Sequence, residues 1–449
     1  MRMARAVGRA LLMMMCAILS ACGSHAKDSR TLEFWTIGRE GEAVVKLLPE
    51  FEREHPGIRI RVQQIPLTAA HEKLLTAYAG DSLPDVTQIG NTWIPEFAAL
   101  HALEPLDALA AASRDVREPD YFPAVWATNR FDGGLYGIPW YVDTRLLFYR
   151  VDLLREAGFD APPRDWTAWR RQMDAIRARS GGKRWGALLP TNEYDQLLAF
   201  ALQQHEPLLR DGGRYGNFRG AGFKRALAFY VDLYRRGDVP PYTNIQVGNP
   251  WEEFGRGAFV FYLSGPWNIG EFRKRLPATQ QDAWSTAPLP GPDGPGDSVA
   301  YGSSLAIPVA SHDKRAAWLL IEYLSRPQVQ QRFYELLGDL PPRRSAWESP
   351  ALKQDPKLHA FRDQLERMQA APPVPEWEQI VNLMQQIAAR AIAGQLTIDQ
   401  AAARMDAQAD TILAKRRWVL DRDAQSLRVK AAIPGRTPEM QPAAKESRG

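Results

Sequence analysis

The first hundred residues alternate between strand-like and helix-like patterns of apolar positions. Residues 31–35 form a short β-favouring run, and apolar residues then recur at helical spacing until His55-Pro56-Gly57 stops the helix. Residues 58–62 alternate apolar and polar side chains, which predicts a strand, and a second helical pattern precedes a strand opened by residues 83–86. Strands that alternate with helices predict an α/β lobe with a largely parallel sheet, where ligands bind at the carboxyl ends of the strands.

The C-terminal third is predominantly helical in pattern. Apolar residues lie on one helical face from Trp377 to Ala391, Gly394 ends that helix, and Thr397 with Gln400 forms a capping box for the next one. A stripe at this spacing is far more typical of a packed core than of a binding site.

The N-terminal segment has the order of features found in a secretory signal. Basic residues precede an apolar run over residues 10–19, which is far shorter than the ~20 residues needed to span a bilayer. The sequence Leu19-Ser20-Ala21-Cys22 then resembles the lipobox of bacterial lipoproteins, in which the cysteine becomes the acylated first residue. We therefore expect a cleaved signal (1–21), a lipidated Cys22, a linker (22–30) and, because Cys16 is removed, no intrachain disulfide.

The length and charge of the chain limit the remaining possibilities. A chain of 449 residues predicts two lobes on a prior of ~150 residues per domain. The 56 basic residues nearly balance the 52 acidic ones without a long basic block, so nucleic acid is not an expected partner. Residues 425–449 are rich in Ala, Pro, Lys and Arg and lack apolar periodicity, which predicts a C-terminal tail.

The sequence contains no complete catalytic or metal-binding motif of the kinds that can be recognised locally. His71-Glu72 begins a zinc-protease pattern, but Leu75 stands where the second histidine is required. Ser311 and Lys314 fit a Ser-x-x-Lys pattern without its Lys-Thr-Gly partner, and Ser311 is better interpreted as the N-cap of a helix. We expect neither catalysis nor a cofactor or metal.

Aromatic side chains beside short polar ones are the most informative chemistry. The chain has 14 tryptophans, and three of them stand in the loop-like stretches 91–93, 139–143 and 265–268 beside Asn, Pro, Gly or Asp. A sugar presents an apolar C–H face that stacks on an aromatic ring and hydroxyls that bond to carboxylates and amides. These loops therefore indicate a carbohydrate site.

At these residues the chain resembles a known family, the extracellular solute-binding proteins of ABC sugar importers, which includes maltose- and trehalose-binding proteins. The resemblance covers nearly the whole mature chain. Its ordered motifs are Leu83-Pro84-Asp85-Val86, 93–97, 103–106, Tyr136-Gly137-Ile138-Pro139, 147–154, 157–159, 162–166, 255–259, Ser264-Gly265-Pro266-Trp267, 301–302, 306–307 and 340–343.

The resemblance implies a periplasmic-binding-protein-like fold of type II, with two α/β lobes, a hinge and a ligand cleft between the lobes. Lobe I would contain residues 31–143 and 300–344, and lobe II residues 144–299 and 345–424. The chain would cross between lobes near residues 143–145, 299–301 and 343–347. Periplasmic binding proteins of this kind close around a ligand by a hinge motion of their lobes.

The resemblance also implies the ligand contacts. Tyr141 and Asp143 match an aromatic ring and a carboxylate of the family's cleft, and Trp267 matches a stacking platform. Glu40 and Glu42 resemble hydroxyl-binding carboxylates, although a solvated helix N-terminus explains them equally well. Asn91 and Trp93 match the loop after the third strand, where Gly90-Asn91-Thr92 replaces a frequent aspartate. The remaining candidates lie where loops vary in length among relatives, and they are Asn192, Glu193, Gly302, Arg343 and Trp377.

The implied function is the substrate-binding component of an ABC carbohydrate importer. A monomer, lipid-anchored outside the cytoplasm and on the periplasmic face in a two-membrane cell, would pass a small sugar to membrane permease subunits. An α-glucosyl disaccharide such as trehalose or maltose is the favoured ligand. Two alternatives stay open: a glycan hydrolase that uses paired carboxylates such as Glu40 and Asp143, and a lipoprotein that binds another protein.

Overall fold

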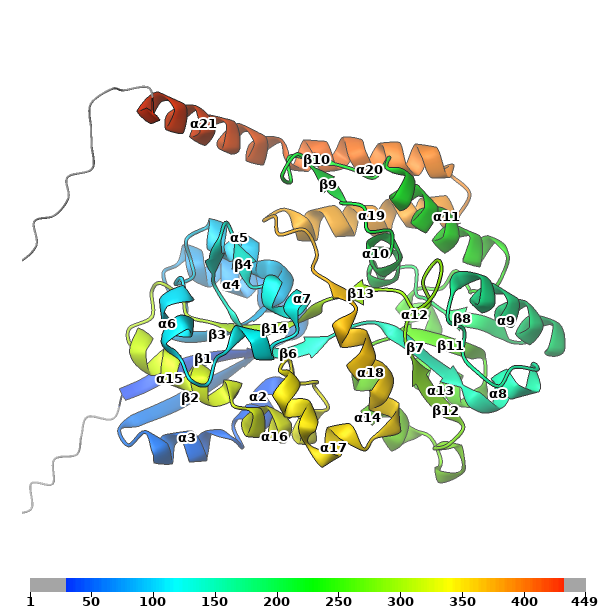
Figure 1. The fold of residues 1–449 in the computed structure, drawn as a ribbon, viewed down its shortest axis with the longest axis horizontal. Coiled ribbons are helices and arrows are strands. Elements are labelled where there is room, and N and C mark those ends of the chain that lie inside the picture. Colours follow the sequence, from blue (N-terminus) through cyan, green and yellow to red (C-terminus); the bar gives the residue numbers. More distant parts are fainter. Residues whose placement is uncertain (1–29, 432–449) are drawn as a thin grey trace, which may run out of the picture. The chain divides into compact units, whose positions relative to one another are not determined.

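The described part of the chain forms two compact units, each built from separate stretches of sequence. A computed structural model describes residues 30–431, so the predicted signal, Cys22 and residues 432–449 lie outside the described residues. Unit 1 contains the described residues up to Val142 together with Gly302–Ala351, and unit 2 contains Asp143–Tyr301 and the residues from Leu352 onward. Figure 1 shows the elements of both units.

The observed crossings can be compared with the predicted lobe boundaries. The first crossing lies between residues 142 and 143, one residue before the predicted boundary. The second lies between residues 301 and 302, two residues after the predicted boundary. The third lies at 351/352, seven residues after the predicted 344/345. The reason is that Trp347 and Ala346 belong to unit 1: Trp347 Nε1 donates to Pro341 O at 2.9 Å, and Gln331 Nε2 donates to Ala346 O at 2.9 Å.

Unit 1 is built on a mixed five-stranded sheet. Strand β1 pairs in parallel with β2 and β3, and β14 is antiparallel to β3, which confirms the three strands predicted near the N-terminus. In sheet order the strands are β2 (Ile58–Ile65), β1 (Arg30–Ile37), β3 (Val86–Gly90), β14 (Tyr301–Ala306) and β6 (Ile138–Asp143).

Helices cover both faces of this sheet, because alternate side chains of each strand enter different cores. Phe34 and Val86 lie in one core with Phe51 and Phe333, whereas Ile89 lies in a second core with residues of α4 and α5. The helices of unit 1 are α2 (Glu40–Val44), α3 (Leu48–Glu54), η1 (Leu67–Ala69), α4 (Ala70–Ala79), η2 (Asn91–Trp93), α5 (Ile94–Ala99), α6 (Asp107–Ala112), η3 (Glu118–Asp120), α7 (Pro123–Ala127), α15 (Lys314–Ser325), α16 (Pro327–Leu337) and η5 (Arg344–Glu348). A short hairpin joins β4 (Arg130–Phe131) to β5 (Gly134–Leu135).

Two local predictions in unit 1 need correction. The helical pattern that ends at His55 is two helices, α2 and α3, because Pro49 stands in the first turn of α3 and cannot supply an amide proton to a continuous helix. The N-cap of α15 is Asp313 and not Ser311, since Asp313 accepts the amide proton of Ala316 at 3.0 Å. The Ser311 hydroxyl instead donates to Asp85 at 3.1 Å.

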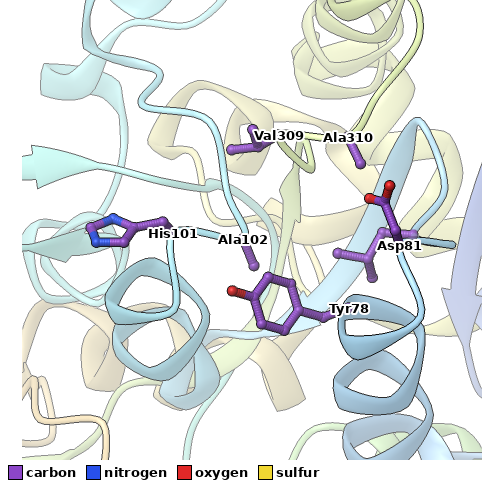
Figure 2. Close-up of a pocket in the computed structure, with 7 residues that line it drawn as sticks. Tyr78, Asp81, His101, Ala102, Val309 and Ala310 are labelled. Atoms are coloured by element: carbon purple, nitrogen blue, oxygen red, sulfur yellow. The ribbon is translucent and has the colours of Figure 1, made fainter.

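A small cavity of about 170 Å³ lies beside the C-terminal end of α4 (Figure 2). The hydroxyl of Tyr78 on its wall donates to Leu100 O at 2.5 Å. No predicted site residue lines the cavity, whose lining consists of Tyr78, Asp81, Leu83, His101, Ala102, Val309 and Ala310.

Unit 2 is built on a mixed four-stranded sheet. Strand β11 is parallel to β8 and antiparallel to β7, which in turn is antiparallel to β12. All six residues of β11 are buried, as expected for a central strand covered on both faces. In sheet order the strands are β12 (Trp284–Ala287), β7 (Leu146–Arg150), β11 (Phe259–Ser264) and β8 (Trp185–Leu188).

The helical pattern of the C-terminal third is confirmed in unit 2. Helix α19 buries the predicted stripe from Trp377 to Ala391, and the capping box of Thr397 and Gln400 opens α20, which packs against α19 (Figure 1). The other elements of unit 2 are, in chain order, α8 (Val151–Glu156), α9 (Trp166–Arg179), α10 (Asp195–Leu202), β9 (Leu209–Arg210), β10 (Tyr215–Gly216), α11 (Ala221–Arg235), α12 (Asn244–Val247), α13 (Pro250–Arg256), α14 (Trp267–Arg275), η4 (Ala278–Gln280), β13 (Ser298–Val299), α18 (Pro356–Glu366), β15 (Met368–Gln369), α19 (Trp377–Ile392), α20 (Ile398–Ile412) and α21 (Ala414–Ala431). Helix α17 (Pro350–Lys353) carries the third crossing.

Helix α21 runs seven residues into the predicted tail, which was expected to begin at Gln425. The absence of apolar periodicity does not prevent a helix where the residues themselves favour one. Residues 414–431 contain neither Pro nor Gly and are rich in Ala, Leu, Arg and Lys, which have high helix propensity.

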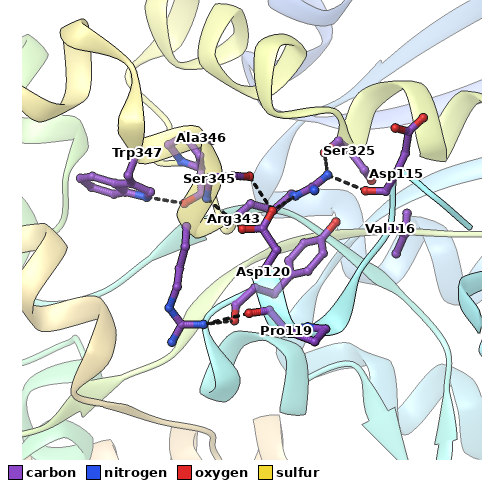
Figure 3. A network of polar contacts seen from close by, with 12 residues as sticks. Asp115, Val116, Pro119, Asp120, Ser325, Arg343, Ser345, Ala346 and Trp347 are labelled. Atoms are coloured by element: carbon purple, nitrogen blue, oxygen red, sulfur yellow. Dashed lines mark hydrogen bonds and ion pairs between the residues drawn. The ribbon is translucent and has the colours of Figure 1, made fainter.

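Arg343 holds together three segments of unit 1 (Figure 3). Its side chain is buried; Nε donates to Asp120 Oδ2 at 2.7 Å, and Nη1 donates to the backbone oxygens of Asp115 and Ser325, both at 2.5 Å. Burial alone would raise the pKa of Asp120, but hydrogen bonds from Ser345 and Arg343 outweigh it and hold that pKa below its usual value. Arg343 is therefore fully engaged inside unit 1.

Gly302 permits the close approach of β14 to β6. Its φ is 137°, and a Cβ atom on this residue would lie 2.2 Å from the backbone oxygen of Tyr141. A side chain at this position would separate the two strands, so Gly302 has a backbone role in the sheet.

Substitution of Arg343 by Met should lower the free energy of unfolding by about 3 kcal/mol at pH 7, because the Asp120 carboxylate loses its buried partner. Urea denaturation measures this difference. The folded-state pKa of Asp120 is lowered, so its stabilising effect is present at neutral pH, and the difference between the proteins should shrink as acid protonates Asp120. The control is Arg315→Met, an exposed arginine of α15, which should change stability by less than about 0.5 kcal/mol. Equal midpoints for wild type and Arg343→Met would contradict this role.

Substitution of Gly302 by Ala should destabilise the protein by about 2 kcal/mol or more, since strain from φ adds to the clash with β6. The matched control is Gly270→Ala in α14, where a Cβ meets nothing within 4 Å. That change should be neutral or stabilise by up to about 1 kcal/mol. A thermal midpoint for Gly302→Ala equal to that of the control would refute the close-approach argument.

Candidate ligand-binding site

The predicted site residues are distributed over both units, and each set is described within its own unit. Unit 1 holds Glu40, Glu42, Asn91, Trp93, Tyr141, Gly302 and Arg343, and unit 2 holds Asp143, Asn192, Glu193, Trp267 and Trp377.

In unit 1, Glu40 ends a series of hydrogen bonds that we call the Glu40 network. The Tyr141 hydroxyl donates to Glu40 Oε1 at 2.9 Å, and the Ser303 hydroxyl donates to the Tyr141 oxygen at 3.1 Å. Gln88 Nε2 donates to the Ser303 oxygen at 3.1 Å, and Gln88 Oε1 accepts the backbone amide proton of Ile37 at 2.7 Å. Each group donates toward the carboxylate, so the network fixes the orientation of Glu40 and of the Tyr141 ring.

Burial controls the ionisation of this network. It raises the pKa of Glu40 above its usual value, against the lowering effect of hydrogen bonds from its own backbone and from Tyr141. It also raises the pKa of Tyr141, and the neighbouring Glu40 charge adds to that shift. Tyr141 is therefore a neutral donor at physiological pH, and an ionised Glu40 is a strong acceptor for a hydroxyl. Glu42, two residues further on, is exposed on α2.

Asn91 and Trp93 lie in η2, directly after β3, but only Trp93 offers surface. Asn91 is buried, and its Nδ2 donates to Thr128 Oγ1 at 3.2 Å. The half-buried Trp93 ring packs edge-on against His71 with ring centroids 4.9 Å apart. A Cβ atom on Gly90 would lie 3.1 Å from this indole, so the absence of a side chain at Gly90 gives the Trp93 ring room over the backbone.

In unit 2, Asp143 and Trp267 meet at one arginine, Arg145. Arg145 Nη1 donates to Asp143 Oδ2 at 2.7 Å, and Nη2 lies 3.5 Å from Asp195 Oδ2. The guanidinium carbon lies 4.9 Å from the Trp267 ring centroid and 5.4 Å from that of Tyr301. We call these five residues the Arg145 cluster.

The Asp143 carboxylate has one oxygen paired and one unpaired. Burial raises its pKa above the usual value, and the charge of Arg145 opposes that shift. Oδ1 is buried and makes no hydrogen bond of regular geometry within the described part of the chain, and the backbone amide of Thr144 also lowers the pKa of this carboxyl group. A buried acceptor without a donor costs about 1–3 kcal/mol, and a ligand hydroxyl would remove that cost.

Trp267 is the first residue of α14, and its ring folds back over the preceding turn. A Cβ atom on Gly265 would lie 1.9 Å from the ring, so this glycine is required for the position of the indole. The ring is half-buried, in contrast to Trp377, whose side chain is 1% exposed in the core of unit 2. A ring with so little exposed surface has no free face for a ligand, so we do not retain Trp377 as a contact.

Asn192 and Glu193 fasten their loop to α12. Asn192 Oδ1 accepts the backbone amide proton of Asn244 at 2.9 Å, and Glu193 Oε1 accepts from the Asn244 side chain at 2.9 Å. Glu193 Oε2 also accepts from Gln196 at 2.6 Å. Their hydrogen bonds shape this loop, and Glu193 adds negative charge near Arg145.

The structure therefore joins Glu40 to Tyr141 and Asp143 to Trp267, whereas it places Asn91, Arg343 and Trp377 in the interior of their units. Sequence reasoning missed Arg145, Asp195 and Tyr301 as members of the cluster. The spacing of Asp143 and Arg145 was an available signal, because alternate residues of an extended segment share a side. Asp195 and Tyr301 are at least 50 residues from Arg145 in sequence, and no local pattern links them to it.

Residues 30–431 contain neither a metal-binding cluster nor a membrane span. No group of three or more His, Cys, Asp or Glu side chains in this range is arranged to hold a metal ion. None of the helices over the same residues is both long enough and apolar enough to cross a membrane.

Several known proteins that this chain resembles are described as binding proteins or receptors. Residues 46–360 match the family model described as bacterial extracellular solute-binding protein. The sugar-binding protein MalE from the phytopathogen Xanthomonas citri is 54% identical, with a TM-score of 0.85 over 87% of this chain and 99% of that one. The GacH receptor of Streptomyces glaucescens, whose structures include an acarbose complex, is 25% identical, with a TM-score of 0.74 over 86% of this chain and 98% of that one. The arabinooligosaccharide-binding protein of Bacillus subtilis is 22% identical over 363 residues, which are 77% of this chain and 82% of that protein.

The structural neighbours establish that the chain has the type II periplasmic-binding-protein fold, which confirms the predicted fold class. The family model spans well over half of the sequence. The chain thus belongs to the bacterial extracellular solute-binding proteins.

Proposed function

We propose that this chain is the substrate-binding component of an ABC-type carbohydrate importer, and that it binds a small neutral sugar. The observation that carries the proposal is the Arg145 cluster, where the Asp143 carboxylate, with one unpaired oxygen, and the half-buried Trp267 indole contact the same guanidinium. An apolar C–H face and a hydroxyl are the two surfaces that a sugar offers to such a pair. The Xanthomonas and Bacillus relatives, described as binding sugar and arabinooligosaccharide, support the same class of ligand.

The balance of charge favours a neutral ligand over an anionic one. Around the guanidinium of Arg145 lie the carboxylates of Asp143, Asp195 and Glu193, and unit 1 has its own candidate carboxylate in Glu40. Carboxylates accept hydroxyl protons well and repel phosphate or carboxylate groups. Within neutral sugars, we propose an α-glucosyl disaccharide such as trehalose or maltose.

The proposed mechanism is capture and delivery without chemistry. Ligand favours a closed form only to the extent that it binds that form more tightly than the open one. The liganded protein then delivers the sugar to a membrane permease, and a lipid on Cys22 holds the protein near that permease on the outer side of the cell membrane. A single acyl chain binds a membrane only weakly and reversibly, so the number of acyl chains on Cys22 determines how firmly the protein is held.

Calorimetric titration of the full chain with a panel of sugars that includes trehalose, maltose, cellobiose and glucose tests the proposal. A saturable heat with one of them, and no release of monosaccharide over hours, is the expected result. Release of monosaccharide would replace transport with hydrolysis. If no sugar produced heat or raised the melting temperature, the proposal of a carbohydrate ligand would be wrong.

Trp267→Ala should weaken binding of the sugar found in that panel by about thirtyfold or more, the loss expected when a central aromatic contact worth about 2 kcal/mol is removed. The fold should persist, as measured by circular dichroism. Trp418→Ala is the matched control, because this indole is 62% exposed on α21. Affinity that is unchanged by Trp267→Ala would remove Trp267 from the site.

A further inference from the structure

Arg145 contacts two carboxylates and two aromatic rings, all within unit 2. Its side chain is 12% exposed, and its N–H groups meet the carboxylates of Asp143 and Asp195. Its guanidinium carbon lies over the rings of Trp267 and Tyr301. These four partners come from four separate segments: the end of β6, the start of α10, the start of α14 and the start of β14.

We propose that Arg145 is a positioning residue of the sugar site, which fixes the Asp143 carboxylate and the Trp267 ring in one relative geometry and does not itself bind the sugar. The proposal rests on the function proposed above and names the group that determines its stereochemical selectivity. With Oδ2 of Asp143 held by Arg145, Oδ1 is the acceptor left for a hydroxyl. A sugar must then present that hydroxyl at a set angle to the C–H face that stacks on Trp267.

The geometry requires an arginine in particular. A planar guanidinium bonds carboxylates along its edge while its faces contact aromatic rings, whereas an ammonium supplies charge without a plane. Lysine at this position would keep the charge beside Asp143 and lose the contacts that align it with Trp267. The two functions of Arg145, charge and alignment, can therefore be separated by substitution.

The charges around Asp143 predict what the loss of Arg145 does to its ionisation. Asp143 faces Arg145 and Asp195, and Arg145 additionally faces Glu193. Tyr194 and Tyr301 lie near Asp195 and Arg145, and Glu378 acts on both tyrosines. Without the guanidinium, Asp143 keeps the like charge of Asp195 and loses its counter-ion, so the pKa of Asp143 must rise.

The test compares Arg145→Met and Arg145→Lys with wild type in two measurements on the full chain. The first is titration with trehalose and maltose at pH 7.5 and pH 5.0. Arg145→Met should weaken binding about tenfold or more at pH 7.5. It should weaken binding further at pH 5.0, because the raised pKa of Asp143 lets acid protonate its carboxylate. Arg145→Lys should also bind more weakly, with the pH dependence of wild type. Glu40 titrates equally in all three proteins, so it does not affect the comparison.

The second measurement needs no sugar. The ¹³C carboxyl resonance of Asp143, assigned with Asp143→Asn, should titrate at higher pH in Arg145→Met than in wild type. If wild type binds no sugar, the proposed function fails, and this titration still decides whether Arg145 sets the state of Asp143. If Arg145→Met does not fold, Arg145→Lys tests whether Arg145 aligns Asp143 with Trp267. Wild-type affinity in Arg145→Lys would overturn the proposal.

Arg150→Lys provides the matched structural control. Arg150 is also a buried arginine of unit 2, and it is paired with Asp152 and with the backbone oxygens of Phe254 and Gly255. Its substitution should lower the melting temperature and leave both sugar affinity and the Asp143 titration unchanged. Equal effects of Arg150→Lys and Arg145→Lys on affinity would show that Arg145 contributes only stability, and would overturn the proposal.

Discussion

Burying a guanidinium in a protein costs several kcal/mol unless carboxylates and carbonyls replace the water that it loses. Both units meet this constraint at an arginine. In unit 1, Arg343 draws η3, α15 and the segment before η5 together, because its acceptors come from Asp115, Asp120 and Ser325. In unit 2, Arg145 does the same for β6, α10 and the two rings beside it.

The two arginines differ in what they leave unsatisfied. Asp120, the partner of Arg343, also accepts from Ser345, and hydrogen bonds keep its pKa low. Asp143, the partner of Arg145, retains one buried oxygen without a donor among the residues that the structure describes, and burial keeps its pKa high. A saturated pair stabilises its unit, whereas an incompletely saturated pair can recognise a ligand. The distinction is not visible in residue type, because both pairs are Arg with Asp.

Local patterns in the sequence were sufficient for much of the fold. Alternation identified β2, the stripe from Trp377 to Ala391 identified the core face of α19, and Thr397 with Gln400 identified the start of α20. Errors arose where two local signals competed, as at Ser311 and Asp313, which are both good N-caps and are decided by the contact of Ser311 with Asp85. The third crossing was misplaced because Trp347 returns to unit 1 through a hydrogen bond to Pro341.

The site was harder to predict from the sequence than the fold was. Family resemblance singled out Asp143 and Trp267, and the apolar stripe already favoured a core position for Trp377. No local pattern indicated that Arg343 is buried, because its burial depends on packing against distant segments. The membership of Arg145 in the cluster depends on α10 and α14, which begin 50 and 122 residues after it, at Asp195 and Trp267. Family resemblance indicated which positions to consider as site residues, and only the side-chain contacts in the structure showed what each residue does.

The place of β14 in the sheet of unit 1 has a consequence for how the chain is made. This strand lies between β3 and β6, yet it begins at Tyr301, more than 200 residues after β3 ends at Gly90. Until those residues emerge from the ribosome, the sheet lacks an interior strand and the facing edge of β3 has open hydrogen-bonding groups. Open edges are where strands of other molecules pair, and pairings this distant in sequence form slowly. Unit 1 is thus completed only after most of unit 2 has been synthesised. Until then, the nascent chain must be protected from pairing with other chains through the open edge of β3.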